Sequence, residues 1–213
     1  MTLEDNAAAV RRSTQSGALD GSIPQCPPGL SPALLERAVR ARFRAERRER
    51  AARLDRDADA DAITTAALAV VDEEGLAPGD WVSIYESTPV EPPTDRLIAA
   101  LRARGIRVMV PITLPDLDLD WAEAGAPEAP LGTHAIGQAR VVFLPALSVD
   151  RSGTRLGQGG GCYDRAIPRA PGARLVALVH PWEVREEPLP LEPHDRRVEA
   201  VITAADGLVS LAP

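Results

Sequence analysis

Residues 81–110 read WVSIYESTPVEPPTDRLIAALRARGIRVMV, and this stretch decides the fold. The run 81–85 predicts a strand, because it is short, apolar and rich in β-branched and aromatic residues. Residues 94–104 predict a helix, with a capping threonine at its start and a glycine directly after its end. A second apolar run at 106–110 predicts another strand. A strand, a helix and a strand in this order are typical of an α/β protein.

The same alternation continues on both sides of this stretch. Upstream, a serine and a proline at 31 and 32 predict the start of a helix, and a second helix is expected over 59–73. Downstream, three more apolar runs predict strands at 141–144, 175–179 and 198–202. We therefore predict one α/β domain over residues 32–213, with a mostly parallel central sheet and helices on both faces, in a Rossmann-like three-layer arrangement. Ligands of such sheets bind at the carboxyl ends of the strands.

The remaining features of the chain concern its location. Residues 1–31 predict a disordered tail, because glycine and proline interrupt any periodicity and apolar residues are few. No apolar run reaches the ~18 residues of a spanning helix, and the first residues lack the apolar core of a secretory signal. Two cysteines are too few for a disulfide framework. We therefore expect a cytoplasmic monomer that does not enter a membrane.

The charge of the chain is unevenly distributed. All 24 basic residues are arginines, which excludes a Walker-type phosphate-binding lysine and a lysine-bound pyridoxal cofactor. The net charge of −7 argues against a nucleic-acid-binding protein. Residues 36–56 nevertheless hold nine arginines and four acids, a local charge of +5, so the rest of the chain carries −12. One concentrated basic helix in an acidic protein indicates a local site for an anion.

A glycine-rich motif at residues 155–165, RLGQGGGCYDR, is the strongest local feature. Its four glycines allow several backbone N–H groups to point at one anion, and a helix expected to start near Tyr163 adds its positive end. Arg155 is the natural charged partner for phosphate oxygens. A flexible loop or a glycine-rich hairpin is the alternative. A dinucleotide-binding fingerprint is disfavoured, because Cys162 stands where its last glycine should be and residues 150–154 form a turn.

This motif resembles the signature of the 5-formyltetrahydrofolate cyclo-ligase family, also called 5,10-methenyltetrahydrofolate synthetases. Three further segments agree with the family in the same order. Residues 34–48 resemble its arginine-rich opening helix, and 85–98 resemble its strand, acidic loop and helix. Residues 191–198, followed by 201–203, resemble its closing motif. The resemblance covers residues 32–209.

The resemblance implies an ATP- and Mg²⁺-dependent ligase. Such an enzyme converts 5-formyltetrahydrofolate into 5,10-methenyltetrahydrofolate and releases ADP and phosphate. The formyl oxygen is a poor leaving group, so the family first transfers the γ-phosphoryl group to it. The nearby N10 amine then attacks the resulting iminium phosphate and closes the ring. The implied substrate is a reduced folate, and no enzyme nucleophile is needed.

The resemblance also implies a role for individual residues of this chain. Catalytic roles fall to Arg155 and Asp164, and Mg²⁺ binding falls to Asp164 and Asp195. Substrate contacts fall to Glu86, Glu91, Gly159 and Gly160. Contacts with ATP fall to Arg40, Arg155, Leu156, Gly157, Gln158, Gly159, Gly160, Gly161, Cys162 and Tyr163. Without the resemblance, Asp164 could be a helix N-cap, Asp195 could close an Asx-turn, and Glu91 could be a loop acid.

Two positions depart from the family pattern. Glu36 stands where the family has a lysine four residues before the helix arginine, and Glu86 stands where an apolar or small residue is expected. These departures motivate an alternative, a diverged paralogue that binds folate or nucleotide without catalysis. A phosphosugar isomerase or sensor on a similar sheet is a further alternative, which would need no ATP.

Overall fold

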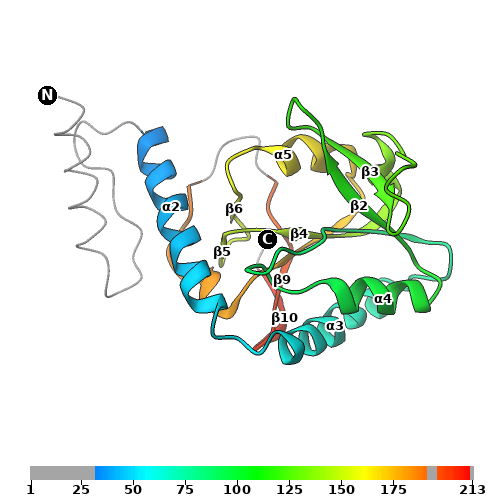
Figure 1. Ribbon diagram of the computed structural model, residues 1–213, viewed down its shortest axis with the longest axis horizontal. Coiled ribbons are helices and arrows are strands. Elements are labelled where there is room, and N and C mark those ends of the chain that lie inside the picture. The colour runs from blue at the N-terminus through cyan, green and yellow to red at the C-terminus, as the bar shows by residue number, and fades with distance from the viewer. Residues whose placement is uncertain (1–31, 191–195, 212–213) are drawn as a thin grey trace, which may run out of the picture.

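The computed structural model of the chain describes residues 32–190 and 196–211 (Figure 1). The predicted tail, residues 1–31, and the predicted metal ligand Asp195 lie outside the described residues. No helix in the described part of the chain is both long enough and apolar enough to cross a membrane.

A seven-stranded sheet in the order β10-β9-β7-β4-β1-β2-β3 forms the centre of the structure. Its five inner strands run parallel: β9 (Ala200–Thr203), β7 (Arg174–Leu178), β4 (Ala139–Pro145), β1 (Trp81–Ile84) and β2 (Arg107–Thr113). These are the five strands that the sequence predicts. The edge strands β3 (Leu119–Glu123) and β10 (Gly207–Ser210) pair antiparallel with their neighbours and were not predicted.

Helices α3 (Arg56–Glu73) and α4 (Asp95–Ala103) cover one face of this sheet. The α3 helix begins three residues before its predicted start, because Asp55 caps it by accepting a hydrogen bond from the Ala58 N–H. The opposite face is covered by the short helix α5 (Cys162–Ala166) and the 3₁₀ turns η1 (Ala135–Gln138) and η2 (Ile167–Arg169). The predicted α/β class is confirmed, with short helical turns making up the third layer.

Side chains of the inner strands alternate between the two layers. In β4, Val141 and Phe143 pack with α3 and α4, whereas Val142 and Leu144 pack with the short turns. All four side chains are fully buried. Burial on both faces is the physical reason why the inner strands are continuous apolar runs.

A second, three-stranded sheet in the order β6-β5-β8 supports the first helix. Its strands are β5 (Ser148–Asp150), β6 (Arg155–Leu156) and β8 (Val184–Arg185), and the 3₁₀ turn η3 (Pro181–Glu183) precedes β8. Helix α2 (Pro32–Ala51) begins at the predicted proline. Its Val39 and Phe43 form a small core with Leu147, Leu156 and Leu189. This packing places α2 beside the glycine-rich motif, which leaves the sheet at the end of β6 (Figure 1).

Candidate active site

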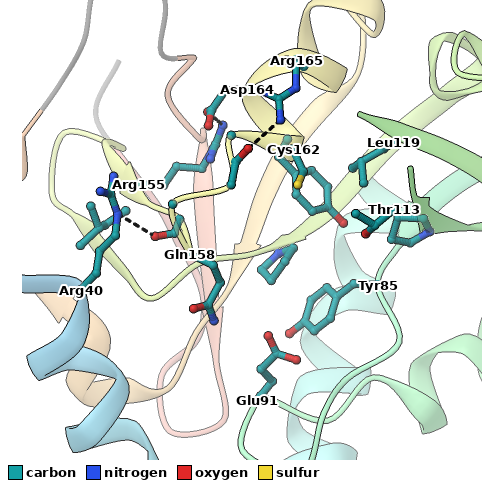
Figure 2. A pocket seen from close by; sticks show the side chains of 18 of the residues that line it. Arg40, Tyr85, Glu91, Thr113, Leu119, Arg155, Gln158, Cys162, Asp164 and Arg165 are labelled. Carbon is teal, nitrogen blue, oxygen red and sulfur yellow. Dashed lines mark hydrogen bonds and ion pairs between the residues drawn. The ribbon is translucent and has the colours of Figure 1, made fainter. Parts of the chain in front are cut away.

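A cavity of about 550 Å³ lies between α2, the glycine-rich motif and the carboxyl ends of β1, β2 and β4 (Figure 2). This is the edge of the sheet at which the sequence predicts ligand binding. All of the predicted site residues that the structure describes line this one cavity; Asp195 lies outside the described residues. They are Arg40, Glu86, Glu91, Arg155, Leu156, Gly157, Gln158, Gly159, Gly160, Gly161, Cys162, Tyr163 and Asp164.

The glycine loop, residues 157–161, takes backbone conformations that favour glycine. Gly159 has a φ of +100° and Gly161 has a φ of +65°. Gly161 is the N-cap of α5, so the helix starts at Cys162, one residue before the predicted position. Asp164 therefore lies in the first turn of α5 and is not its N-cap. Without side chains between 159 and 161, the loop exposes its backbone to the cavity.

Arg155 and Asp164 form an ion pair at one end of the cavity (Figure 2). The Arg155 side chain is 5% exposed and that of Asp164 is 28% exposed. The Nε of Arg155 is buried and has no hydrogen-bond partner among the described residues. Because a buried donor without a partner is costly, this guanidinium fits an anion that would complete its hydrogen bonds.

Arginines of α2 hold the outer side of the glycine loop. The Nε of Arg40 donates to the carbonyl of Gly157 at 3.3 Å, and an N–H of Arg44 donates to the carbonyl of Gln158 at 3.2 Å. The sequence favours a solvated helix face for Arg44, but its spacing of four residues from Arg40 places it on the same side of α2. Arg40 also pairs with Glu36 at 2.8 Å, and Glu36 lines the cavity.

The loop after β1 brings Glu91 to the opposite end of the cavity. An oxygen of its carboxylate, Oε2, accepts hydrogen bonds from the N–H and the hydroxyl of Thr88, at 2.9 and 2.8 Å. The Glu91 side chain is 13% exposed. Glu91 is thus held by hydrogen bonds within its own loop, and it also lines the cavity. Glu86, from the same loop, is exposed at the cavity wall.

The charge of this carboxylate reaches two tyrosines, Tyr85, which is buried, and Tyr163, which is partly buried. Burial raises the pKa of Tyr85 well above its ordinary value, and the charge of Glu91 raises it further. The pKa of Tyr163 is raised by burial first and then by Glu91. The Tyr85 hydroxyl donates to the carbonyl of Pro92 at 3.2 Å, whereas the Tyr163 hydroxyl has no partner among the described residues. Both phenols stay protonated, so Tyr163 has a donor to offer to a ligand.

Several other residues that line the cavity were not predicted from the sequence. Pro111 and Thr113 come from β2, Leu119 begins β3, and Pro145 ends β4. Pro111, Thr113 and Pro145 could have been predicted from their position at the carboxyl ends of parallel strands. Leu119 could not be predicted in this way, because it belongs to an unpredicted antiparallel edge strand.

Mg²⁺ binding is predicted for Asp164 and Asp195, of which Asp195 lies outside the described residues. Within residues 32–190 and 196–211, no group of three or more His, Cys, Asp or Glu side chains could hold a metal ion. Asp164 is the described member of the predicted pair, and its Oδ1 accepts from Arg155. Because Mg²⁺ is usually bound by one or two carboxylates together with water and substrate phosphates, a hard oxygen ligand beside an anion site fits this ion.

Comparisons with known proteins agree with this geometry. A model of the 5-formyltetrahydrofolate cyclo-ligase family matches residues 35–204. The 5-formyltetrahydrofolate cyclo-ligase of Mycolicibacterium smegmatis is 38% identical over 152 residues, which are 62% of this chain and 78% of that protein. The mitochondrial enzyme of the same name from Arabidopsis thaliana is 36% identical over 81 residues, 33% of this chain and 29% of that protein.

Two solved structures share the fold. A 5,10-methenyltetrahydrofolate synthetase from Mycoplasma pneumoniae superposes with a TM-score of 0.63 at 16% identity, covering 78% of this chain and 96% of that one. The Aquifex aeolicus 5,10-methenyltetrahydrofolate synthetase gives 0.61 at 15% identity, covering 82% and 94%. The family match over most of the chain, on a cavity lined by the family's motif, shows that this protein belongs to the 5-formyltetrahydrofolate cyclo-ligase family.

Proposed function

We propose that the protein converts 5-formyltetrahydrofolate into 5,10-methenyltetrahydrofolate, with ATP as co-substrate and Mg²⁺ as the metal ion. The names of its relatives supply the substrate and the product of this reaction. The observation that carries the proposal is one cavity with two chemically different ends. An arginine and a glycine loop form one end, and a carboxylate beside Tyr85 forms the other.

The first end suits the phosphates of ATP. Arg155 has a buried Nε without a partner, and the backbone of residues 157–161 lies open beside it. Arg40 approaches the same loop from α2. Asp164 would hold Mg²⁺ together with Asp195, and the ion would neutralise charge on the phosphate oxygens.

The second end suits the reduced pterin ring. Glu91 can accept hydrogen bonds from the amino and ring N–H donors of a pterin, and Tyr163 can donate one. Pro111 and Leu119 offer apolar contact area for a flat ring. Hydrogen bonds to a substrate in a partly buried site give strong discrimination, because analogues would leave the protein groups unpaired.

The reaction needs positioning and charge neutralisation from the chain. The γ-phosphoryl group moves from ATP to the formyl oxygen and leaves ADP behind, which makes that oxygen a good leaving group. N10 of the substrate then attacks the formyl carbon, loses its proton, and phosphate leaves as the five-membered ring closes. Arg155 neutralises negative charge during the transfer, and Glu91 fixes the ring so that the formyl oxygen faces the phosphates.

The direct test is the appearance of methenyl-folate absorbance from 5-formyltetrahydrofolate, ATP and Mg²⁺. Asp164→Asn should abolish turnover, and Arg155→Ala should raise the KM for ATP. Glu186→Gln is a matched control, because Glu186 pairs with Arg151 in an exposed ion pair and does not line the cavity. Near-normal turnover by Asp164→Asn would show that its assigned role is wrong.

One observation favours a second candidate, a paralogue that binds folate without catalysis. Glu36 neutralises Arg40 at the phosphate end, which lowers the affinity expected for a nucleotide. Folate binding without any methenyl-folate absorbance would support this candidate. We also propose that the enzyme acts as a cytosolic monomer; sedimentation analysis tests the oligomeric state.

A further inference from the structure

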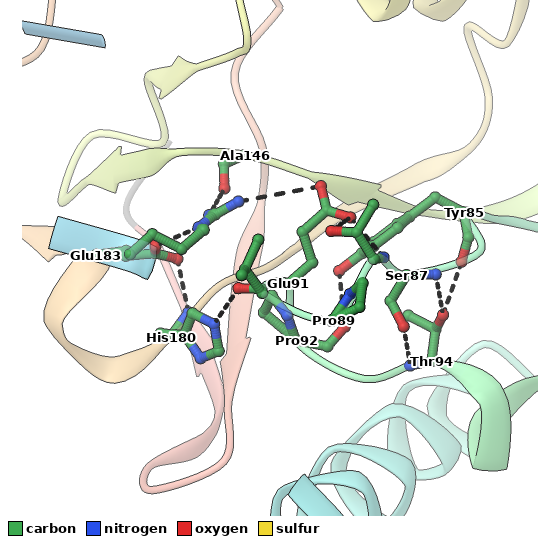
Figure 3. Close-up of polar contacts among 12 residues, drawn as sticks. Tyr85, Ser87, Pro89, Glu91, Pro92, Thr94, Ala146, His180 and Glu183 are labelled. Atoms are coloured by element: carbon green, nitrogen blue, oxygen red, sulfur yellow. Dashed lines mark hydrogen bonds and ion pairs between the residues drawn. The ribbon is translucent and has the colours of Figure 1, made fainter. Parts of the chain in front are cut away.

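A buried ion pair lies behind the Glu91 loop and does not line the cavity (Figure 3). Arg47 of α2 and Glu183 of η3 are each 2% exposed. The Nε of Arg47 donates to Oε1 of Glu183 at 2.6 Å, and its Nη2 donates to Oε2 at 2.8 Å. The Nη2 also donates to the carbonyl of Ala146. Two edges of the guanidinium are thereby fixed.

The third nitrogen of this guanidinium faces Glu91. The Nη1 of Arg47 lies 4.0 Å from Oε1 of Glu91, while Oε2 of Glu91 is held by Thr88. One cation therefore stands between two carboxylates, one fully buried and one at the cavity. The bidentate pair with Glu183 leaves the guanidinium little freedom to rotate, so its Nη1 marks a fixed direction for the Glu91 carboxylate.

Glu183 also holds the backbone next to Glu91, through His180. Oε2 of Glu183 accepts from the backbone N–H of His180 at 2.9 Å. The His180 ring stacks on Trp182, with ring centroids 4.6 Å apart, and its Nε2 donates to the carbonyl of Val90 at 3.0 Å. From the other side, Arg56 donates to the carbonyl of Glu91 at 2.8 Å.

We infer that Arg47, fixed by Glu183, is a positioning residue that orients the Glu91 carboxylate for the folate. The inference rests on the proposed function, since it takes Glu91 to be the group that reads the substrate. Stability alone does not account for the pair, because a buried ion pair can often be replaced by apolar residues without loss of stability. A fixed carboxylate binds its ligand without first losing conformational freedom, which increases affinity.

The test is a double-mutant cycle on ligand affinity, measured by calorimetry on the full chain with 5-formyltetrahydrofolate and, separately, with ATP and Mg²⁺. Arg47→Lys keeps the charge but loses the two-nitrogen contact with Glu183. We expect it to weaken folate binding about tenfold and to leave ATP binding within about twofold. In a Glu91→Gln background, the same change should alter folate affinity less than about twofold, because the group that Arg47 orients is gone.

Arg48→Lys is the matched control, since Arg48 is the next residue of α2 and is exposed. It should change neither affinity. Glu183→Gln is a second route to the same cycle if Arg47→Lys does not fold, and it should show the same dependence on Glu91. An equal loss of folate affinity in both backgrounds, or an unchanged folate affinity in Arg47→Lys, would overturn the inference.

The same measurements separate this inference from the proposed function. A wild-type protein that binds 5-formyltetrahydrofolate but forms no methenyl-folate would refute the proposed reaction, while the cycle would still decide the role of Arg47. A wild-type protein that does not bind the folate at all would overturn both.

Discussion

Glu36 stands one helical turn before Arg40 on α2, and the two side chains bond at 2.8 Å at the edge of the cavity. Both are about one-quarter exposed, at 26% and 24%. Such a helix pair contributes little to stability, because water screens it. Its effect on the affinity for an anion is larger than its effect on stability. Glu36 takes up hydrogen-bond donors of Arg40, and its own negative charge repels phosphate.

We therefore expect Glu36→Gln to lower the KM for ATP by about two- to fivefold, which corresponds to about 0.5–1 kcal/mol. Steady-state kinetics at varied ATP measures this. Glu49→Gln is the control, because Glu49 of the same helix pairs at the same spacing with Arg53, just after the helix end, away from the cavity. An unchanged or higher KM for ATP in Glu36→Gln would contradict the assignment of Arg40 to the nucleotide.

His180 gives the stability of the protein a dependence on pH. Burial lowers its pKa below the ordinary 6.5, and the charge of Arg47 lowers it further, against opposing contributions from Glu183, the Val90 carbonyl and Asp59. The unfolded chain therefore takes up a proton on this histidine at a higher pH than the folded chain does. The free energy of unfolding must then fall as the pH drops below about 7, by at most about 1.4 kcal/mol per pH unit for one group.

Urea unfolding at several pH values between about 5.5 and 7.5 measures this dependence, in a window above the ordinary pKa of carboxylates. We expect His180→Gln to flatten the slope of the free energy of unfolding against pH. His134→Gln should leave the slope unchanged, because His134 is exposed. Equal slopes for the wild type and His180→Gln would show that another group is responsible.

At the scale of elements, the glycine loop depends on backbone conformations that other residues adopt at a cost. Gly159 has a φ of +100°, and a Cβ there would meet the Arg40 side chain at an ordinary contact distance of 3.5 Å. The obstacle to a larger residue is thus the backbone and not the available space. Gly159→Ala should destabilise the fold by about 1–2 kcal/mol and raise the KM for ATP, because the loop must shift to relieve the strain.

Thermal unfolding and ATP kinetics measure the two effects of Gly159→Ala. Gly172→Ala is the matched control, since Gly172 has no positive φ and a Cβ there would have nothing within 4 Å. That change should leave the ATP kinetics at the wild-type level. If Gly159→Ala also keeps the wild-type KM for ATP, the loop does not hold the phosphates as assigned.

Strands buried on both faces could be predicted from sequence, and the two edge strands could not. The inner strands are uninterrupted apolar runs, as in β4, because both of their faces are covered. In β3, by contrast, Asp120 stands between Leu119 and Trp121, and Glu123 ends this edge strand. Such a short acidic stretch is easily taken for a loop, and its pairing with β2 is visible only in three dimensions.

At the scale of the whole molecule, motif resemblance located most of the residues that line the cavity, but only where a motif contains them. Arg47 and Glu183 lie 136 positions apart in the chain, and neither belongs to the glycine-rich motif. Their side chains meet because α2 docks on the small sheet through Val39 and Phe43. Contacts of this kind depend on tertiary packing, which no local pattern encodes.

The described part of the cavity is built from residues that follow position 35, where the family match also begins. We therefore expect deletion of residues 1–30 to leave kcat and both KM values within about twofold of the full chain. Deletion of residues 1–44 should abolish activity, because it removes Arg40 together with Val39 and Phe43. A large loss of activity from the shorter deletion would make the first thirty residues part of the functional unit.

The cations around the glycine loop, Arg40, Arg44 and Arg155, are all guanidinium groups. A guanidinium keeps its proton far into alkaline solution, so the positive potential at this end is constant across the range in which enzymes work. Acetylation and other amine-directed modifications find no side-chain target in a chain without lysine. Lysine acylation therefore cannot regulate this chain.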